Sequence, residues 1–190
     1  AIWTYDQNFN ALNTATLNGQ DSWGTMAGTV DVIGSGGADG GSPDKYAKAW
    51  QNGAVSTINR LITSSVSGTF YVSMMRNTTA ASYAGIFYVF DDATLPFEID
   101  FTGGNISIAG TNIGTYSANT WYRIGVQYET GAGAWEGLAA DTLKGNIDGG
   151  AWSSAIAFRS AVDDVNKIRI YDHDGDGTYS VGVDWIASAV

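Results

Sequence analysis

The segment 172–180 has the residue types and the spacing of a calcium-binding loop. Carboxylates stand at its first, third and fifth positions, and a glycine stands at the sixth, where such a loop bends sharply. The predicted ligands are Asp172, Asp174, Asp176, the carbonyl of Thr178, and Ser180. Position twelve would require a bidentate Glu but is Val183, with Asp184 next. The segment therefore predicts a Ca²⁺ site outside an EF-hand pair, and a solvated Asp-Gly hairpin tip is the alternative.

The density of negative charge around the segment 172–180 favours the calcium site over the solvated hairpin tip. Between residues 163 and 184 the chain carries six Asp against Lys167 and Arg169, a local charge of −4. Like charges this close repel one another unless a cation neutralises them. Other site chemistries are poorly represented. The sequence has one His, His173, and no Cys, which argues against a zinc cluster, a nucleophilic Cys and a Ser-His-Asp arrangement elsewhere in the chain.

Aromatic residues indicate a second kind of site. Seven Trp and ten Tyr exceed the needs of one core, and exposed rings can stack on sugars while polar neighbours bond the hydroxyl groups. The candidate glycan-binding residues are Trp50, Trp135 and Trp152 near loops, and Trp121, Arg123 and Gln127 on the outer face of one strand. Each of these Trp could instead be packing. Trp23 and Trp185 are assigned to the core, and Asn77 and Asn105 begin N-glycosylation acceptor patterns.

The elements that would carry these residues are short β-strands. A period of two dominates the chain, and tight-turn pairs such as Asn18-Gly19 separate the runs. Strands are predicted at 2–9, 23–33, 55–63, 68–76, 85–91, 97–101, 105–109, 111–116, 120–129, 133–138, 142–148, 155–158, 165–171 and 179–189. One short helix is predicted at 43–50, where Pro43 suits a first helical position. So many short strands predict an all-β sandwich or jelly roll.

Length and charge bound the partners. With 190 residues the chain is expected to form one domain, 1–190, without disulfides. Nine basic against nineteen acidic residues give a net charge of −10, which disfavours nucleic acid and anionic lipid. No apolar run reaches the ~20 residues of a membrane span. The low Lys content and the abundance of Gly, Thr, Ser and Asn favour a secreted or cell-surface protein. The chain is interpreted as a mature form without its signal peptide.

Several segments resemble bacterial concanavalin A-like, laminin G-like jelly rolls. The matching stretches, in the expected order, are 9–23 (FNALNTATLNGQDSW), 119–129 (NTWYRIGVQYE), 145–152 (GNIDGGAW), 166–171 (NKIRIY) and 179–186 (YSVGVDWI). The resemblance implies a β-sandwich of two antiparallel sheets. It also implies a structural calcium ion between the first and last strands, with Asp6, Asn8, Asn10 and Asp184 as candidate ligands; an ordinary surface ion pair is the alternative for Asp184.

Laminarinase-type glycosidases share this fold, and the resemblance extends to the start of their catalytic strand. Glu98-Ile99-Asp100 matches the beginning of their Glu-x-Asp-x-x-Glu pattern. Retaining hydrolysis needs a second carboxyl group, which the pattern places at residue 103, and that residue is Gly103. The chain is therefore expected not to be an enzyme. Glu98 and Asp100 are interpreted as outward residues of a strand whose Ile99 and Phe101 face the core.

Two functions remain from the sequence. The first is an extracellular, calcium-stabilised module for glycan binding or surface adhesion, with a polysaccharide or glycan as partner. The second is a structural subunit of a secreted, self-assembling fibre or surface layer, with copies of itself as partner, because both chain ends are apolar and Lys and Pro are scarce. A polysaccharide-degrading enzyme is a minor alternative.

Overall fold

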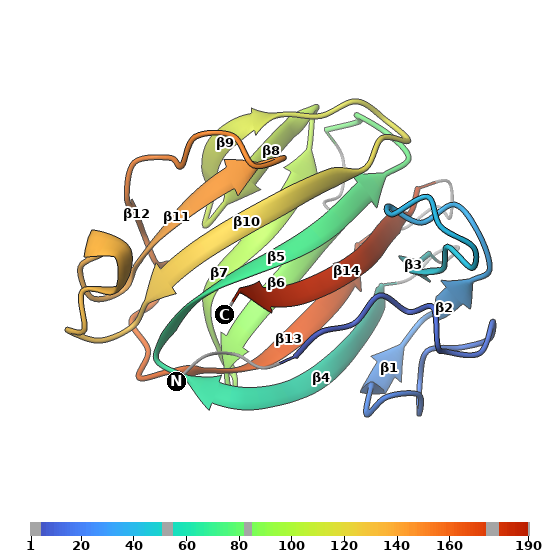
Figure 1. The fold of residues 1–190 in the computed structure, drawn as a ribbon, viewed down its shortest axis with the longest axis horizontal. Helices are drawn as coiled ribbons and strands as arrows, with labels where there is room; N and C mark the ends of the chain where they lie inside the picture. Colours follow the sequence, from blue (N-terminus) through green and yellow to red (C-terminus); the bar gives the residue numbers. More distant parts are fainter. Residues whose placement is uncertain (1–4, 51–54, 82–84, 174–178, 190) are drawn as a thin grey trace.

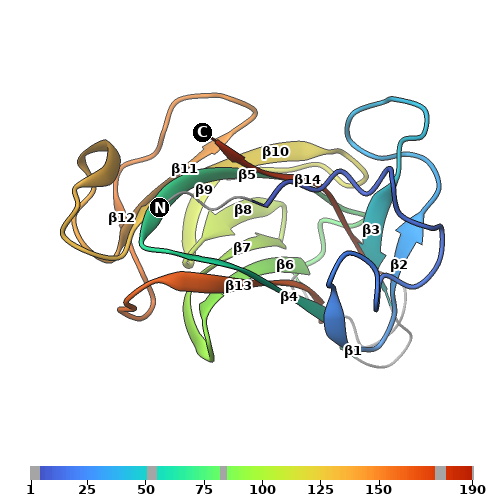
Figure 2. The ribbon, with the colours of Figure 1, turned by 60° about the horizontal axis from the view of Figure 1, so that its bottom comes forward.

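Two antiparallel sheets of seven strands each face one another in the computed structural model (Figures 1 and 2). The structure describes residues 5–50, 55–81, 85–173 and 179–189. We call the sheet nearer the viewer in Figure 1 the front sheet and the other the back sheet. This arrangement confirms the predicted all-β, jelly-roll sandwich.

The strands are short and follow the predicted runs closely. In spatial order the back sheet contains β1 (Gly24–Ala27), β4 (Ser56–Ser65), β13 (Val165–Asp172), β6 (Gly85–Asp91), β7 (Thr94–Thr102), β8 (Asn105–Ile108) and β9 (Thr111–Thr115). The front sheet contains β12 (Ile156–Ala157), β11 (Thr142–Ile147), β10 (Tyr122–Glu129), β5 (Ser67–Arg76), β14 (Val181–Ala189), β3 (Tyr46–Ala49) and β2 (Val30–Ile33).

The last two strands complete the middle of both sheets. β13 pairs with β4 and β6, and β14 pairs with β5 and β3. Residues near the C-terminus therefore lie beside residues from the first third of the chain. This return places the loop between β2 and β3 next to β14, where the candidate site lies (Figure 1).

Alternate residues of each strand fill the space between the sheets. Phe70 of β5 contacts Phe87 and Phe97 of the back sheet, with ring centroids 6.3 and 6.4 Å apart. Each fully buried aromatic or aliphatic side chain stabilises the fold by about 1.5–3 kcal/mol. Ile99 and Phe101 also lie in this core, as the sequence predicts, and so does Trp23, which is 1% exposed.

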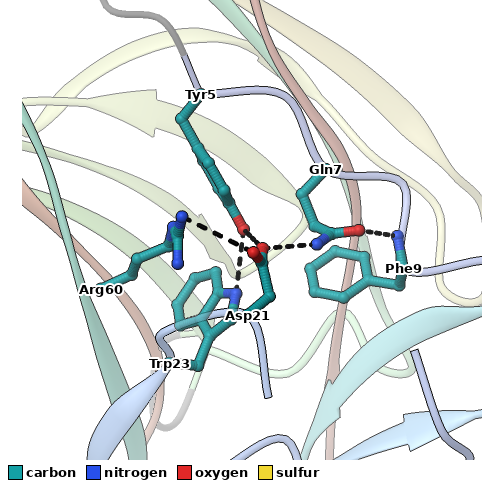
Figure 3. A network of polar contacts seen from close by, with 6 residues as sticks. All are labelled: Tyr5, Gln7, Phe9, Asp21, Trp23 and Arg60. Carbon is teal, nitrogen blue, oxygen red and sulfur yellow. Dashed lines mark hydrogen bonds and ion pairs between the residues drawn. The ribbon is translucent and has the colours of Figure 1, made fainter. Parts of the chain in front are cut away.

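A polar network fastens the N-terminal segment to the sandwich (Figure 3). The Asp21 carboxylate accepts hydrogen bonds from the Tyr5 hydroxyl at 2.8 Å and from Gln7 Nε2 at 2.6 Å. Trp23 Nε1 donates to the Tyr5 hydroxyl at 3.0 Å, and the Arg60 guanidinium lies 4.0 Å from the Tyr5 ring centroid. The backbone of Gln7 then bridges to Ile186 on β14. The described parts of the two chain ends thus pair within the domain.

Removing Asp21 should destabilise this end of the sandwich. We expect Asp21→Ala to lower the free energy of unfolding by about 2 kcal/mol, because it removes the shared acceptor of two donors, and hydrogen bonds to charged groups contribute about 1.5–3 kcal/mol. Urea denaturation measures the change. Glu136→Ala is the control, since the exposed Glu136 carboxylate bonds to no described residue. Equal effects of the two substitutions would show that the network does not stabilise the fold.

Two of the predicted elements are wrong. The helix predicted at 43–50 is instead β3, because Tyr46–Ala49 pair with β14 and β2, and this tertiary pairing overrides local helix propensity. The strand predicted at 133–138 is a 3₁₀ turn at Trp135–Gly137. Its backbone visits the left-handed region at Ala134 and Glu136, and the buried Glu129 carboxylate accepts the Trp135 amide at 3.0 Å.

Two other strands have different extents from the prediction. The run 23–33 divides into β1 and β2, which belong to opposite sheets, and Gly28 between them adopts φ 68°. That positive angle is open to glycine at little cost and lets the chain cross from one sheet to the other. The described part of the predicted strand 2–9 forms only the single Gln7–Ile186 bridge. The extended backbone ends at Phe9, which has φ 59°.

Candidate metal centre and aromatic cleft

A bulge in β14 creates the candidate site. The pairing of β14 with β5 shifts register between Asp184 and Ala187, and Trp185 within the shift has φ 41°. Bulges of this kind redirect side chains and often lie at functional sites. Here the bulge leaves Asp184 fully buried and exposes 38% of Trp185. The assignment of Trp185 to the core was therefore wrong, because the strict alternation on which it rested is broken at this residue.

Asp184 lies in a cluster of three carboxylates. One oxygen each of Asp39, Asp44 and Asp184 lie within 4.8 Å of one another, so the cluster could hold a metal ion. Asp184 Oδ2 accepts the Ala38 amide at 2.8 Å, and Oδ1 accepts the Trp185 amide at 2.7 Å. The loop 34–44 between β2 and β3 supplies Asp39 and Asp44, whereas β14 supplies Asp184.

Gly37 shows how closely oxygen atoms converge beside the cluster. A Cβ atom at Gly37 would lie 2.6 Å from Asp44 Oδ1, 2.8 Å from Asp184 Oδ2 and 3.0 Å from the Lys45 carbonyl oxygen. Asp44 Oδ1 is buried and accepts no hydrogen bond from the described chain. Several hard oxygen ligands, one of them without a donor, are the kind of set that Ca²⁺ or Mg²⁺ prefers. The residues present therefore fit a divalent cation.

The cluster is electrostatically unfavourable without a cation. Burial, followed by the charges of Asp39 and Asp44, raises the pKa of Asp184 to about 6, although two backbone amides oppose the shift. The pKa of Asp44 is also raised, mainly by its hydrogen bond with Asp39. Carboxyl groups with raised pKa values retain protons that a metal ion would displace, so metal affinity should rise with pH.

These shifts give a stability profile with a defined sign. Because the folded pKa of Asp184 lies above its unfolded value of about 3.9, the protonated group stabilises the fold below about pH 4, and this stabilisation is lost as the pH rises through 6. In EDTA we therefore expect the free energy of unfolding of wild type to fall by about 2–3 kcal/mol more than that of Asp184→Asn between pH 4 and pH 7.5, because the Asn side chain does not titrate. Urea denaturation of both proteins at both pH values measures this difference, and an equal pH dependence of the two proteins would contradict it.

The other predicted metal ligands are placed differently. Asp6 is exposed and is not among the three clustered carboxylates, whereas Asn10 Oδ1 accepts the Lys45 amide at 2.8 Å next to the cluster. Asp172 and Ser180 are both buried, and Ser180 donates its amide to Asn77 Oδ1 at 2.8 Å. Asp174, Asp176 and Thr178 lie outside the described residues, so calcium in the loop 172–180 stays a prediction.

An aromatic cleft adjoins the carboxylate cluster on the outer face of the front sheet. Its volume is about 210 Å³, below the ~300–1,000 Å³ of sites for drug-sized ligands, which suits a single sugar ring. Its lining comprises Ala38, Asp39, Ser73, Trp121, Tyr122, Arg123, Asp148 and Trp185. A second hollow of about 390 Å³, which shares Arg123 and Asp148, extends it past Tyr71 and Gly149. A chain of several sugars could therefore follow the sheet surface here.

Arg123 occupies the floor between the two hollows. Its guanidinium carbon lies 4.3 Å from the Tyr71 ring centroid and 4.0 Å from that of Trp185, so two rings hold the planar group. No described residue accepts a hydrogen bond from its side chain or lies within ion-pair distance of it. The Arg123 backbone amide donates to Asp148 Oδ1 at 2.8 Å, and both residues line the two hollows.

Trp121 joins the cleft to the loop 34–44. Its Nε1 donates to the Gly36 carbonyl at 3.0 Å, and its ring packs edge-on against Tyr46, with centroids 5.3 Å apart. The loop 34–44 is thus attached to the front sheet by Trp121 on one side and by Asp184 on the other. An ion held by Asp39, Asp44 and Asp184 would stabilise one wall of the cleft.

The remaining candidate glycan-binding residues lie outside the cleft lining. Trp50 is 41% exposed and has the Lys48 ammonium group 5.6 Å from its ring centroid. Trp135 Nε1 donates to Thr69 Oγ1 at 3.3 Å, and Trp152 and Gln127 are half-buried. Of the six predicted residues the structure therefore brings together Trp121 and Arg123, and it adds Trp185, Tyr122, Ser73, Asp39 and Asp148.

The predicted N-glycosylation sites are both half-buried. Asn77 Oδ1 accepts the Ser180 amide, as described above, and Asn105 accepts a hydrogen bond from Asn112 Nδ2 at 3.0 Å. Modification of the side-chain nitrogen at either position stays a prediction.

Glu98, the candidate nucleophile of the glycosidase-like pattern, is tied to a cation. Arg159 Nε lies 2.8 and 2.6 Å from its two carboxylate oxygens, and Arg159 Nη2 also bonds to Oε1. Only 4% of Glu98 is exposed. Burial raises the pKa of Asp100, which accepts the Thr102 hydroxyl at 2.9 Å. Gly103 occupies the hairpin to β8 with φ 61° and offers no carboxyl group.

Comparison with known proteins identifies the fold. No protein-family model matches the sequence, and no curated protein matches it either. Among solved structures, a sialidase superposes with a TM-score of 0.74 at 11% identity, over 98% of this chain and 18% of the sialidase chain. The Bacillus licheniformis beta-glucanase superposes with a TM-score of 0.60 at 12% identity, over 99% and 98% of the two chains.

A third similar structure is the carbohydrate-binding module CBM66 from Bacillus subtilis, with a TM-score of 0.50 at 15% identity, over 94% of this chain and 98% of the module. The chain therefore has the concanavalin A-like jelly-roll fold, as the sequence resemblance implied. Glycan-binding modules and glycoside hydrolases share this fold, and identities this low establish the fold alone. In the described residues no helix is long and apolar enough to cross a bilayer.

Proposed function

We propose that this chain is a non-catalytic glycan-binding module that acts outside the cell, as a secreted or surface-attached protein. The observation that carries the proposal is the cleft in which Trp121, Arg123 and Trp185 come together on the front sheet. Aromatic faces bind the apolar sides of sugar rings, and the neighbouring polar groups bond hydroxyl groups. Both hollows are open to solvent along the sheet, which suits a polysaccharide or a cell-surface glycan and hence adhesion.

We further propose that Ca²⁺ is the ion of the carboxylate cluster. Asp39, Asp44 and Asp184 would hold it, and the Lys45 carbonyl, which converges with Asp44 and Asp184 at Gly37, is an additional oxygen. All of these are hard oxygen donors, and Ca²⁺ tolerates the irregular geometry that a loop and a strand together supply. When bound, the ion would offset most of the negative charge of the three carboxylates. Its role is structural, because it would fix the loop 34–44 against β14.

A glycan array followed by isothermal titration calorimetry tests the binding proposal. We expect at least one polysaccharide or oligosaccharide to bind with a dissociation constant in the micromolar to millimolar range, and Trp121→Ala to weaken that binding. Absence of binding to a broad array in the presence of calcium would contradict the proposal.

The surroundings of Glu98 support the non-catalytic part of the proposal. A carboxylate bonded through both oxygens to Arg159 is a weak nucleophile, and a retaining glycosidase needs a second carboxyl group about 5–5.5 Å away. We expect no release of reducing ends from β-glucan or galactan, and no difference between wild type and Glu98→Gln. Release that disappears in Glu98→Gln would overturn this expectation and support the minor alternative of a polysaccharide-degrading enzyme.

A structural subunit of a self-assembling fibre is the second candidate. Two exposed apolar side chains favour it, because exposed apolar groups can mark contact surfaces. Leu61 of β4 is 74% exposed, and Val66, in the turn between β4 and β5, is 47% exposed. Sedimentation velocity with calcium distinguishes the candidates. A large species that disappears in Leu61→Ser would support assembly, whereas a monomer at all concentrations would leave the glycan-binding function.

A further inference from the structure

The cleft offers a cationic donor group without an internal acceptor. The Arg123 guanidinium is stacked between Tyr71 and Trp185, and no described residue accepts its hydrogen bonds. The stacking orders this planar group before any ligand arrives, so little side-chain entropy remains to be lost on binding. Arg123 Nε itself is buried and has no acceptor in the described chain.

Acceptor groups lie next to this donor. Asp148 uses Oδ1 for the Arg123 backbone amide, and its Oδ2 accepts no hydrogen bond from the described chain. Asp39 and Ser73, which belongs to the neighbouring strand β5, line the same cleft. A ligand in the cleft therefore meets both a guanidinium donor fork and a carboxylate oxygen that accepts no hydrogen bond from the described chain.

A pair of sugar hydroxyl groups matches this combination. Each hydroxyl oxygen can accept a hydrogen bond from the guanidinium, and each hydroxyl hydrogen can be donated to a carboxylate. An ionised uronate or sulfate could use the donor fork, but it would also face the charge of Asp148, which offsets that of Arg123. With Ca²⁺ bound, the three clustered carboxylates beside the cleft still leave a net charge of −1, in a chain whose own net charge is −10.

We propose, on the basis of the glycan-binding function above, that the ligand is a neutral glycan, recognised through vicinal hydroxyl groups by Arg123 and Asp148 and stacked on Trp185. The same cleft discriminates against uronic-acid and sulfated glycans. Arg123 is the donor that orients the sugar ring, and Asp148 is the acceptor that rejects anions.

Matched sugar pairs test the proposal. The probes are β-1,4-linked hexasaccharides of glucose and of mannose, each compared with the hexasaccharide of the corresponding uronic acid, which differs only in a carboxylate for a CH₂OH group. Calorimetry in calcium is expected to give at least tenfold tighter binding of a neutral member than of its uronate. Binding of the neutral sugar should change less than twofold when NaCl is raised tenfold, because it involves no ligand charge.

Substitutions separate the two roles. Arg123→Lys keeps the charge but loses the fork, and Asp148→Asn removes an acceptor charge; each should weaken neutral binding at least fivefold, with Gln127→Ala on the same strand as the control. Melting curves confirm that each variant is folded. Asp148→Asn should also strengthen the weak binding of the uronates, because it removes a repelling charge. Salt-sensitive binding of a uronate that is tighter than binding of its neutral counterpart by the wild-type protein would overturn the neutral-ligand proposal and leave glycan binding intact. The neutral-ligand proposal would also be overturned if none of the four hexasaccharides bound and the array gave another neutral glycan whose binding Arg123→Lys does not affect. An array without any binding glycan would overturn both this proposal and the glycan-binding function.

Discussion

Chelation of calcium is expected to lower the melting temperature by about 5–10 °C. A ligand that binds only the native state at one hundred times its dissociation constant adds about 2.7 kcal/mol, and each kcal/mol shifts the melting temperature of a chain this long by about 2–4 °C. The physical cause is the carboxylate cluster, whose buried member Asp184 has its pKa raised to about 6 by burial and by its acidic neighbours. Differential scanning calorimetry in calcium and in EDTA measures the difference.

Single substitutions locate the ion that causes this shift. Gly37→Ala should abolish the calcium response, because its methyl group would lie within 2.6–3.0 Å of three oxygen atoms beside the cluster. Asp184→Asn should also lose the response. Asp174→Ala tests the other predicted site, the loop 172–180, and should leave most of the response intact. An identical melt with and without EDTA would contradict a calcium site anywhere in the chain, and a response lost only in Asp174→Ala would assign the ion to that loop.

Loss of Trp185 should have the largest effect on glycan binding. We expect Trp185→Ala to weaken binding of the neutral hexasaccharides at least tenfold, which corresponds to about 1.4 kcal/mol. The substitution removes a stacking surface and also releases Arg123, whose guanidinium lies 4.0 Å from the Trp185 ring centroid. Trp50→Ala is the matched control, because Trp50 is similarly exposed, at 41% against 38%, but lies outside the cleft lining. Equal losses in the two variants would contradict a ligand held in this cleft.

The fold could be predicted from the sequence because most strands keep a strict period of two. β10 is an example: Ile124, Val126 and Tyr128 enter the core, while Arg123 remains on the outer face as predicted. Trp121, predicted on the same outer face, directly precedes this strand and lines the cleft. Two of the eight residues that line the cleft, Trp121 and Arg123, thus follow from the pattern of one regular strand.

The rest of the site depends on contacts that local spacing does not encode. Ala38 and Asp184, which meet in the carboxylate cluster, are 146 residues apart. The loop that carries Asp39 and Asp44 has the composition of an ordinary Gly-rich turn, so only the long-range pairing of β14 with β3 gives its carboxylates a role. Alternation along β14 would place Val181, Val183 and Trp185 on one face, and the bulge at Trp185 turns that ring outward.

Indole NMR signals test the central claim, that a glycan binds between Trp121 and Trp185, most directly. Each of the seven Trp residues gives one indole N–H resonance, and single Trp→Phe variants assign them. Titration of the ¹⁵N-labelled, calcium-loaded protein with the tightest-binding neutral hexasaccharide should shift the Trp121 and Trp185 resonances and leave those of Trp23 and Trp50 unchanged. Shifts confined to Trp50, Trp135 or Trp152, with Trp121 and Trp185 unaffected at saturation, would contradict it.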